Sequence, residues 1–308
     1  MNIQHIRIGT RGSALALAQT KMVEEALKGK YPNISFERVI MKTEADRHNE
    51  KALSEFGGEG VFVKELENAL LSGRIDIAVH SAKDMPVRTA EGLCIAGVLP
   101  RGDMRDVLVY RKELSESFDN IKTAIRIGTG SPRRQSQIEA LYPNIICEGI
   151  RGNVPTRLDK VRNGRYDGVI LAAAGLERLG MLKLPEFNYR YFTEDEMLPA
   201  GGQAVIAIEA RMSDDIVPFV EAVSDEKSFI ELSAEQYVLR GLDAGCHEPV
   251  AVRAHVKMDE ISISLAYGTR SLKGDIIRVC RKGKREEWEQ IATELVKIMC
   301  SRNQSENI

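Results

Sequence analysis

The sequence has few cysteines and no cysteine motif. Its five cysteines are odd in number, form no CxxC pair and lie far apart, and the five histidines are equally scattered. Disulfide frameworks and structural zinc sites both need these residues at short, paired spacings. The sequence therefore predicts neither kind of site, and it indicates a protein of the reducing cytoplasm.

Long apolar runs and an excess of charge of one sign are also missing. No apolar run approaches the roughly 18 residues of a membrane-spanning helix, and no charged-then-apolar leader is visible. The formal net charge is −2, whereas general nucleic-acid-binding proteins are usually basic. We therefore expect a cytoplasmic protein that binds neither membranes nor nucleic acid. Any specificity for anions must come from arginines that gather locally.

An internal repeat organises the first two hundred residues of the 308-residue chain. A chain of this length exceeds one comfortable hydrophobic core, so two or three domains are expected. Three motifs occur twice in the same order: RIGT at 7–10 and 126–129, YPNI at 31–34 and 142–145, and GRID or GRYD at 73–76 and 164–167. Such ordered self-similarity predicts two similar α/β lobes that face one another.

Each copy of the repeat is expected to open with a strand and then a helix. In the first copy we expect strands over 6–9, 34–40 and 74–79, a helix over 61–71, and a helix that ends near Gly29 with an apolar face of Leu15, Ala18, Met22 and Ala26. Ser131-Pro132 has the form of an N-cap followed by proline at the first helical position, and Ser13 is placed similarly. Ligands of such sheets bind where helix N-termini favour carboxylates or phosphates.

The last third of the chain has a different pattern. Residues 198–211 form a glycine-rich turn and an apolar strand. A helix over 229–240, strands near 250–256, 261–265 and 276–279, and a helix over 286–299 are expected after it. This order predicts a small α+β domain at the C-terminus.

Arginines are concentrated in two motifs of the second lobe, GTGSPRR at 128–134 and RGNVPTR at 151–157. Paired guanidinium groups can bind carboxylates in a bidentate manner. A solvated basic surface is the alternative. We favour a binding site because Arg11 occupies the equivalent turn of the first lobe, so several cations would face one ligand that carries many carboxylates.

Two further residues have chemical potential. Asp84 comes after a predicted parallel strand and stands beside Lys83, which suits acid–base work, although an Asp before proline also commonly initiates a turn. His80 alone is interpreted as structural. Cys246 lies in a polar turn between Gly245 and a proline, which favours an accessible sulfur over a core thiol.

The ordered motifs resemble one family over essentially the whole chain. IRIGTRGSALALAQ, GVFVKELENALL, DIAVHSAKDMP, GTGSPRRQ, RGNVPTRL, GVILAAAGLERLG and LPAGGQ are similar to hydroxymethylbilane synthases, also called porphobilinogen deaminases. The resemblance implies two α/β lobes like periplasmic-binding-protein domains, over 1–99 with 204–222 and over 104–198. It also implies an α+β domain over 226–308 that carries a cofactor cysteine, and a monomer.

The resemblance further implies an activity and a set of site residues. The enzyme would condense four porphobilinogen molecules, with loss of ammonia, onto a dipyrromethane cofactor in thioether linkage to Cys246, and then release the linear tetrapyrrole by hydrolysis. Asp84 would protonate the departing amine, stabilise the azafulvenium cation and assist loss of the pyrrole α-proton. Cofactor and substrate would be bound by Arg11, Ser13, Ser81, Lys83, Thr129, Ser131, Arg133, Arg134, Arg151, Gly152, Asn153, Arg157, Arg178 and Gln203.

The chain departs from the family pattern at a few positions. Glu55 and Glu59 stand in a loop where the family often has lysines, which should weaken the attraction of an anionic substrate. Gly130 and Pro132 differ from the commoner Ser-Leu. Two other classes stay open: a non-catalytic two-lobed anion-binding protein, which does not explain Asp84 or Cys246, and a thiol hydrolase using His247, which has no evident partner.

Overall fold

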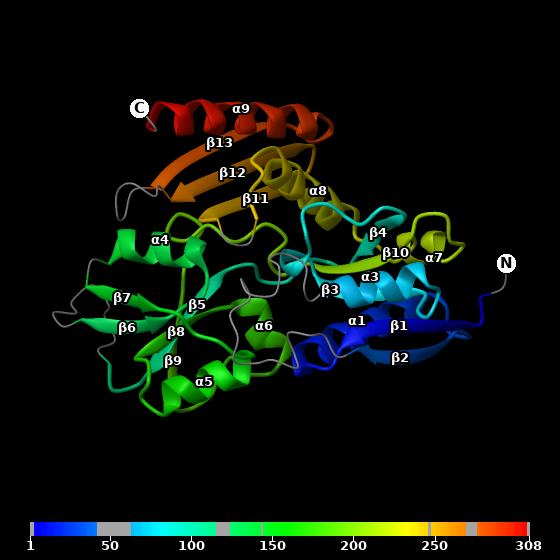
Figure 1. The fold of residues 1–308 in the computed structure, drawn as a ribbon, viewed down its shortest axis with the longest axis horizontal. Coiled ribbons are helices and arrows are strands. Elements are labelled where there is room, and N and C mark those ends of the chain that lie inside the picture. The colour runs from blue at the N-terminus through cyan, green and yellow to red at the C-terminus, as the bar shows by residue number, and fades with distance from the viewer. Residues whose placement is uncertain are drawn as a thin grey trace. The chain divides into compact units, whose positions relative to one another are not determined.

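The computed structural model describes residues 3–41, 63–114, 124–142, 144–245, 248–268 and 276–306. Glu55, Glu59 and Cys246, for which the sequence made predictions, lie outside these ranges. The chain divides into two compact units: Met1–Gly102 with Ala204–Ser233, and Asp103–Gln203 with Ala234–Ile308. The described residues form three sheets, of which one belongs to the first unit and two belong to the second (Figure 1).

The first lobe is a five-stranded sheet of order β2-β1-β3-β10-β4. Its strands are β1 (His5–Arg11), β2 (Ser35–Met41), β3 (Ile77–Ser81), β4 (Leu93–Val98) and β10 (Ile206–Arg211). Strands β1, β2 and β3 are parallel, and β10 is antiparallel to both of its neighbours. Helices α1 (Ala14–Lys30) and α7 (Val217–Glu221) pack on one face, and α3 (Lys64–Leu71) packs on the other.

The second lobe repeats this plan with the order β7-β6-β8-β5-β9. Its strands are β5 (Asp106–Arg111), β6 (Ile125–Gly128), β7 (Ile145–Glu148), β8 (Gly168–Ala172) and β9 (Phe187–Tyr191). Helix α4 (Pro132–Leu141) covers the face that α1 covers in the first lobe. Helices α5 (Val154–Arg162) and α6 (Ala173–Arg178) cover the other face.

The predicted repeat is confirmed by a pair of hydrogen bonds between an Asp and the backbone of an Arg, here called the bracket, that occurs in both lobes. The carboxylate of Asp76 accepts from the backbone N–H of Arg7 at 2.7 Å, and the N–H of Asp76 donates to the carbonyl of Arg7 at 2.9 Å. Asp167 and Arg126 make the same two bonds at 2.8 and 2.9 Å. Each Asp stands just before the central strand of its lobe, β3 or β8, and bonds that part of the chain to the lobe's first strand, β1 or β6.

Two predictions for the first lobe were wrong in detail. Strand β3 begins at Ile77 rather than at residue 74, because Asp76 is engaged in the bracket with Arg7. The buried face of α1 carries Gln19 and Thr20, whereas Met22 is 38% exposed. Burial of these polar residues is tolerated because each has hydrogen-bond partners: Gln19 bonds to the Ser81 hydroxyl, and the Thr20 hydroxyl donates to that of Thr10.

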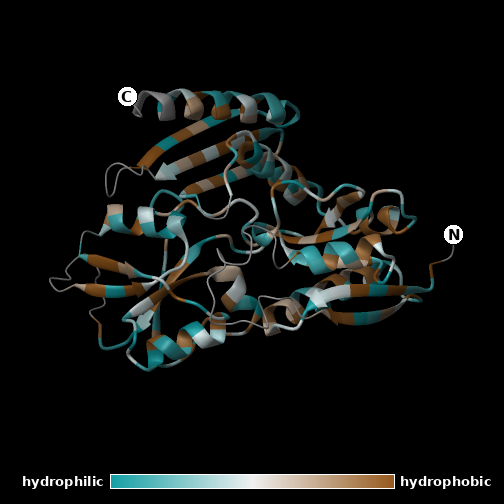
Figure 2. Cartoon of the chain, viewed as in Figure 1, coloured by the Kyte–Doolittle hydropathy of each residue, from teal (hydrophilic) through white to brown (hydrophobic). Residues whose placement is uncertain are grey.

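The C-terminal part is an antiparallel sheet with helices. Strands β11 (Val250–Lys257), β12 (Glu260–Gly268) and β13 (Ile276–Lys284) are consecutive neighbours, and α9 (Trp288–Glu306) packs on β13. Helix α8 (Glu226–Gly241) precedes the sheet. Hydrophobic residues occur in the strands of all three sheets, whereas α3 and α5 show many hydrophilic residues (Figure 2). The predicted class, two α/β lobes plus a small α+β part, is confirmed.

Candidate functional site

Asp84 lies in a short 3₁₀ turn, Ala82–Asp84, directly after β3. The turn is anchored by one backbone hydrogen bond and two buried side chains. The N–H of Ala82 donates to the carbonyl of Val205 at 3.0 Å, and the Ala82 and Met85 side chains are buried. The Asp84 side chain is exposed, and no described residue forms a hydrogen bond or ion pair with its carboxylate. The predicted arrangement, an accessible acid at the carboxyl end of a parallel strand, is therefore present.

Other predicted residues of the first lobe lie at the same edge of the sheet. Arg11 is the last residue of β1, which runs parallel to β3, and it is half-buried. The Ser13 hydroxyl caps α1 by accepting the N–H of Ala16 at 3.2 Å. The Ser81 hydroxyl bonds to the buried Gln19 amide at 2.8 Å. Because the carboxyl ends of β1 and β3 meet at one edge, this edge combines cations, small donors and the acid of Asp84.

In the second lobe the turn between β6 and α4 has the predicted capping geometry. The Ser131 hydroxyl accepts the backbone N–H of Arg134 at 3.5 Å, and Pro132 occupies the first turn of α4. The buried Thr129 hydroxyl accepts the N–H of Ser131 at 3.2 Å. The arginine pair, Arg133 and Arg134, therefore lies in the first turn of α4, at the positive end of the helix dipole.

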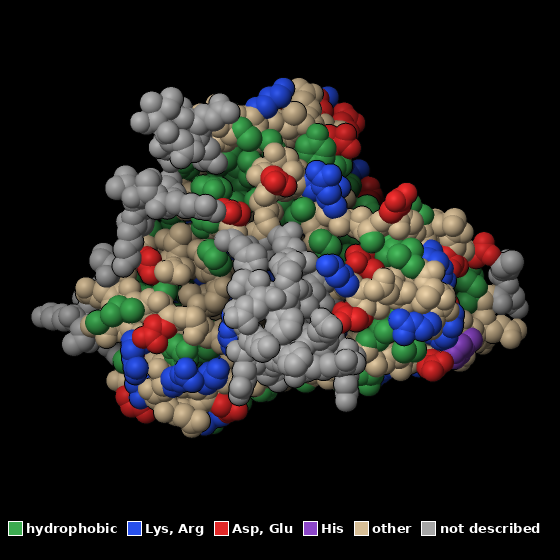
Figure 3. Space-filling model, viewed as in Figure 1, with side chains coloured by type: hydrophobic (Ala, Val, Ile, Leu, Met, Phe, Trp, Pro, Cys, Tyr) green, Lys and Arg blue, Asp and Glu red, His purple; other side chains and the backbone are tan. Residues whose placement is uncertain are grey.

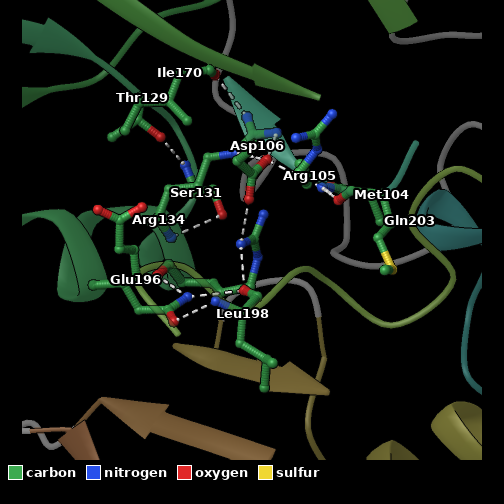
Figure 4. A network of polar contacts seen from close by, with 12 residues as sticks. Met104, Arg105, Asp106, Thr129, Ser131, Arg134, Ile170, Glu196, Leu198 and Gln203 are labelled. Atoms are coloured by element: carbon green, nitrogen blue, oxygen red, sulfur yellow. Dashed lines mark hydrogen bonds and ion pairs between the residues drawn. The ribbon is translucent and has the colours of Figure 1, made fainter. Parts of the chain in front are cut away.

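The arginine pair shares a buried carboxylate that the sequence interpretation missed (Figure 4). Asp106, at the start of β5, is fully buried. One of its oxygens accepts from Arg133 Nη1 at 2.7 Å, and the other accepts from Arg134 Nε and Nη2 at 3.0 and 2.8 Å. Arg133 and Arg134 are themselves only 4% and 7% exposed. Asp106 belongs to none of the sequence motifs described above, and its strand β5 pairs antiparallel with β8.

This cluster carries an excess positive charge. Two guanidinium groups face one carboxylate, and they also donate to the neutral carbonyls of Leu198 and Ile170. Burial lowers the pKa of Arg133, Asp106 opposes this effect, and the adjacent Arg134 reinforces it. Arg133 Nε is buried and has no hydrogen-bond partner among the described residues. The cluster is therefore suited to a further anionic group.

Gln203 is part of the same network rather than a free donor. Its amide nitrogen donates to the carbonyl of Met104 at 2.7 Å and to Asp106 at 3.1 Å. Gln137 of α4 was not predicted, yet it is 2% exposed and bonds both the N–H and the carbonyl of Leu198. The repeat could have indicated Gln137, because Gln137 and Gln19 each stand six residues after the serine cap of their helix.

The RGNVPTR motif forms the turn into α5. Asn153 caps the helix by accepting the N–H of Thr156 at 3.0 Å. Gly152 has a φ of +108°, and a Cβ there would lie 2.7 Å from the Thr156 side chain, so glycine is required. Arg157 Nε donates to the Gly152 carbonyl at 2.7 Å, whereas the Arg151 side chain is exposed.

Arg178 is the last residue of α6. Burial lowers the pKa of its guanidinium group, and the charge of Glu177 partly opposes this effect. Lys83 is the middle residue of the same 3₁₀ turn as Asp84. The structure thus describes every predicted site residue except Cys246, which lies outside the described residues.

The described residues contain no group of three or more His, Cys, Asp or Glu that could hold a metal ion. Within the same ranges, no helix is both long enough and apolar enough to cross a membrane. On the face shown in Figure 3, acidic and basic side chains are interspersed. The excess positive charge of the Arg133 and Arg134 cluster is therefore not part of a uniformly basic surface on that face.

The fold and these residues define a two-lobed α/β protein that is equipped to bind carboxylates and carries an accessible acid. Residues 6–218 match the family model described as "Porphobilinogen deaminase, dipyromethane cofactor binding domain". The chain is 39% identical over 295 residues to the porphobilinogen deaminase of Clostridium novyi (strain NT), covering 96% of this chain and 98% of that one. It is 40% identical over 291 residues to that of Syntrophus aciditrophicus (strain SB), covering 94% and 93%.

The chain belongs to the porphobilinogen deaminase family. The predicted family and the predicted transferase class are thereby confirmed. Among solved structures, the periplasmic aliphatic sulphonate binding protein SsuA of Escherichia coli aligns with a TM-score of 0.43 at 13% identity, covering 78% of this chain and 75% of that one. An amino-acid transporter's substrate binding protein aligns at 0.39 and 16%, covering 71% and 91%. Likeness of this degree carries no inference about this chain.

Proposed function

We propose that this protein is a hydroxymethylbilane synthase. It joins four porphobilinogen molecules head to tail on a dipyrromethane cofactor, releases ammonia at each step, and frees the linear tetrapyrrole by hydrolysis. We further propose that the cofactor is bound through a thioether to Cys246, and that the enzyme is a cytoplasmic monomer.

The observation that carries this proposal is the excess positive charge around Asp106. Porphobilinogen and every product of its condensation carry acetate and propionate groups. A buried cluster with two guanidinium groups and one carboxylate gains most from a ligand that brings further carboxylates, because unpaired buried charge is costly. Arg133, Arg134, Arg151 and Arg157 are therefore proposed to hold the carboxylates of the cofactor and the growing chain. The cofactor supplies the pyrrole carbon to which the first unit is added.

Asp84 is proposed to perform the proton transfers. Loss of ammonia from porphobilinogen requires a proton on the departing amine and leaves positive charge on the pyrrole. A single carboxyl group can give that proton and, once ionised, offset the developing charge. Its position in the turn is anchored by Ala82 and Met85 while its carboxylate is accessible, which satisfies both needs. Arg11 and Lys83, from the same strand edge, are proposed to hold the incoming pyrrole's carboxylates.

The test is the turnover of Asp84→Asn, which keeps the size of the side chain but removes its charge and its transferable proton. We expect a fall of about 10²–10⁴ in kcat. The stability should change by no more than about 0.5 kcal/mol, because the side chain is exposed. Glu91→Gln, at an exposed carboxylate of the same lobe, is the matched control and should retain normal turnover. Near-normal turnover of folded Asp84→Asn would assign the chemistry to another group.

A further inference from the structure

A buried ionisable pair joins the strand that precedes Asp84 to its neighbour in the sheet. His80 of β3 has a side chain that is 5% exposed, and Glu209 of β10 is fully buried. His80 Nε2 lies 3.0 Å from one Glu209 oxygen. The other Glu209 oxygen is buried with no hydrogen-bond partner among the described residues. Such a pair is costly to bury, and well-packed apolar residues are often equally stable or more so.

The charged groups around this pair do not compensate for the cost. Burial, and then the charge of Glu209, raise the pKa of Glu67 on α3, while His80, a backbone hydrogen bond of Ala90 and Lys64 act in the opposite direction. Burial raises the pKa of the Cys94 thiol on β4, and Glu209 and Glu221 add to this effect. The surroundings are therefore mainly acidic, and stability alone does not account for the pair.

The second lobe shows which residues occupy the same position when no such pair is present. Strand pairing aligns Ile77 with Gly168, because each is opposite the equivalent residue of the lobe's first strand. Three residues further on, His80 corresponds to Leu171. Glu209, which is opposite Ala78, corresponds to Val109, which is opposite Val169.

Leu171 and Val109 are 3% and 0% exposed and belong to the same hydrophobic core cluster. The fold therefore accepts an apolar pair at these two positions. The two lobes differ in the segment after the central strand: the first continues into Ser81-Ala82-Lys83-Asp84, and the second into Ala172-Ala173-Ala174-Gly175. The ionisable pair occurs in the lobe that presents the acid.

A hydrogen-bonded pair differs from an apolar pair in being directional. Burial of apolar surface fixes no orientation, whereas a hydrogen bond prefers a narrow range of distances and angles. His80 stands four residues before Asp84, and its ring is hydrogen-bonded to Glu209 of β10. Strand β10 begins directly after Val205, and the carbonyl of Val205 accepts the hydrogen bond from Ala82 in the Asp84 turn. The pair thus restrains the direction in which β3 enters the turn.

We propose that His80 and Glu209 are positioning residues that hold the Asp84 turn in its productive geometry. This inference rests on the proposed role of Asp84. Because a misplacement of about 1 Å can cost about 10²-fold in rate, loss of the pair should lower kcat by at least about 10-fold. KM should change little, since neither side chain is expected to contact substrate.

The test replaces the pair with the residues of the second lobe, His80→Leu together with Glu209→Val. We expect a folded protein with its covalent cofactor present by intact mass, a melting temperature equal to or above that of the wild type, and kcat reduced by at least about 10-fold. Asp76→Asn, at the opposite end of β3, is the matched control for a structural defect. It should lower the melting temperature and leave kcat unchanged, because it weakens the bracket with Arg7.

A second comparison keeps the inference testable if the double variant does not fold. Glu209→Gln retains an oxygen that can accept from His80, whereas Glu209→Val does not. We expect Glu209→Gln to keep more of the wild-type kcat than Glu209→Val. Wild-type kcat in the folded double variant, or equal kcat in the two single variants, would overturn the inference. Asp84→Asn measured in parallel separates the two proposals, since its activity alone decides the role of Asp84.

Discussion

Asp106→Asn is the perturbation whose effect can be worked out most directly from the structure. The carboxylate of Asp106 is fully buried and receives three hydrogen bonds from Arg133 and Arg134 and one from Gln203. Asparagine keeps the shape but removes the negative charge, and its amide NH₂ group cannot accept. Two buried guanidinium groups would then face each other with no counter-charge among the contacts that the structure shows.

The expected cost is large for a change of so few atoms. Breaking a buried ion pair by removing one partner costs about 3–5 kcal/mol. For a domain of 150–250 residues, 1 kcal/mol corresponds to about 2–4 °C, so the melting temperature should fall by ~6–20 °C. Asp103→Asn is the matched control three residues earlier in the chain. Its pair with Arg105 is at the surface, with side chains 28% and 48% exposed, so its loss should cost no more than about 1 kcal/mol.

The assay is thermal unfolding of the protein with and without its cofactor. The variant raises the excess positive charge of the cluster, so a ligand rich in carboxylates should stabilise Asp106→Asn more than it stabilises the wild type. Equal destabilisation by Asp103→Asn and Asp106→Asn would refute the reasoning. So would an Asp106→Asn protein that gains nothing from the cofactor.

Two further predictions concern the division of tasks and the response to acid. Arg133→Leu should impair cofactor assembly and leave much apo-protein, whereas Arg11→Leu should accumulate cofactor-loaded enzyme that elongates poorly. Mass spectra that resolve zero to four added pyrroles will distinguish the two variants, and identical distributions would contradict this division of tasks between the arginines. Burial raises the pKa of Asp76, but hydrogen bonds from Arg7 lower it further, to below its ordinary value of 3.8. The carboxylate therefore stabilises the fold fully above that value and loses its contribution as the pH falls below it. The free energy of unfolding should thus depend less on pH in the acid range for Asp76→Asn than for the wild type, and parallel curves for the two proteins would count against this bracket.

Local sequence signals predicted the elements that depend on local chemistry. The serine caps at Ser13 and Ser131 are set by residues within a few positions, and both are found. The repeat was readable because Asp76 and Asp167 perform the same task in each lobe. Arg11 at the end of β1, and Ser131 and Asn153 at the starts of α4 and α5, lie at the strand ends and helix starts that the motifs indicated.

The features that the sequence did not indicate depend on pairing between distant strands. Asp106 is found beside Arg133 because β5 lies next to β8, and no spacing along the chain encodes that neighbour. The partnership of His80 with Glu209 across 129 positions is of the same kind. The buried face of α1 was misjudged because hydropathy cannot reveal that a glutamine will find a partner inside.

The mass of the intact protein tests the central claim most directly. Protein purified from a host that makes porphobilinogen should be heavier than its sequence by two linked pyrroles, and peptide mapping should locate them on Cys246. Cys246→Ser should yield the unmodified mass, because a neutral hydroxyl is a much poorer nucleophile than a thiolate. An active enzyme with an unmodified Cys246, or with the adduct on another residue, would contradict the account.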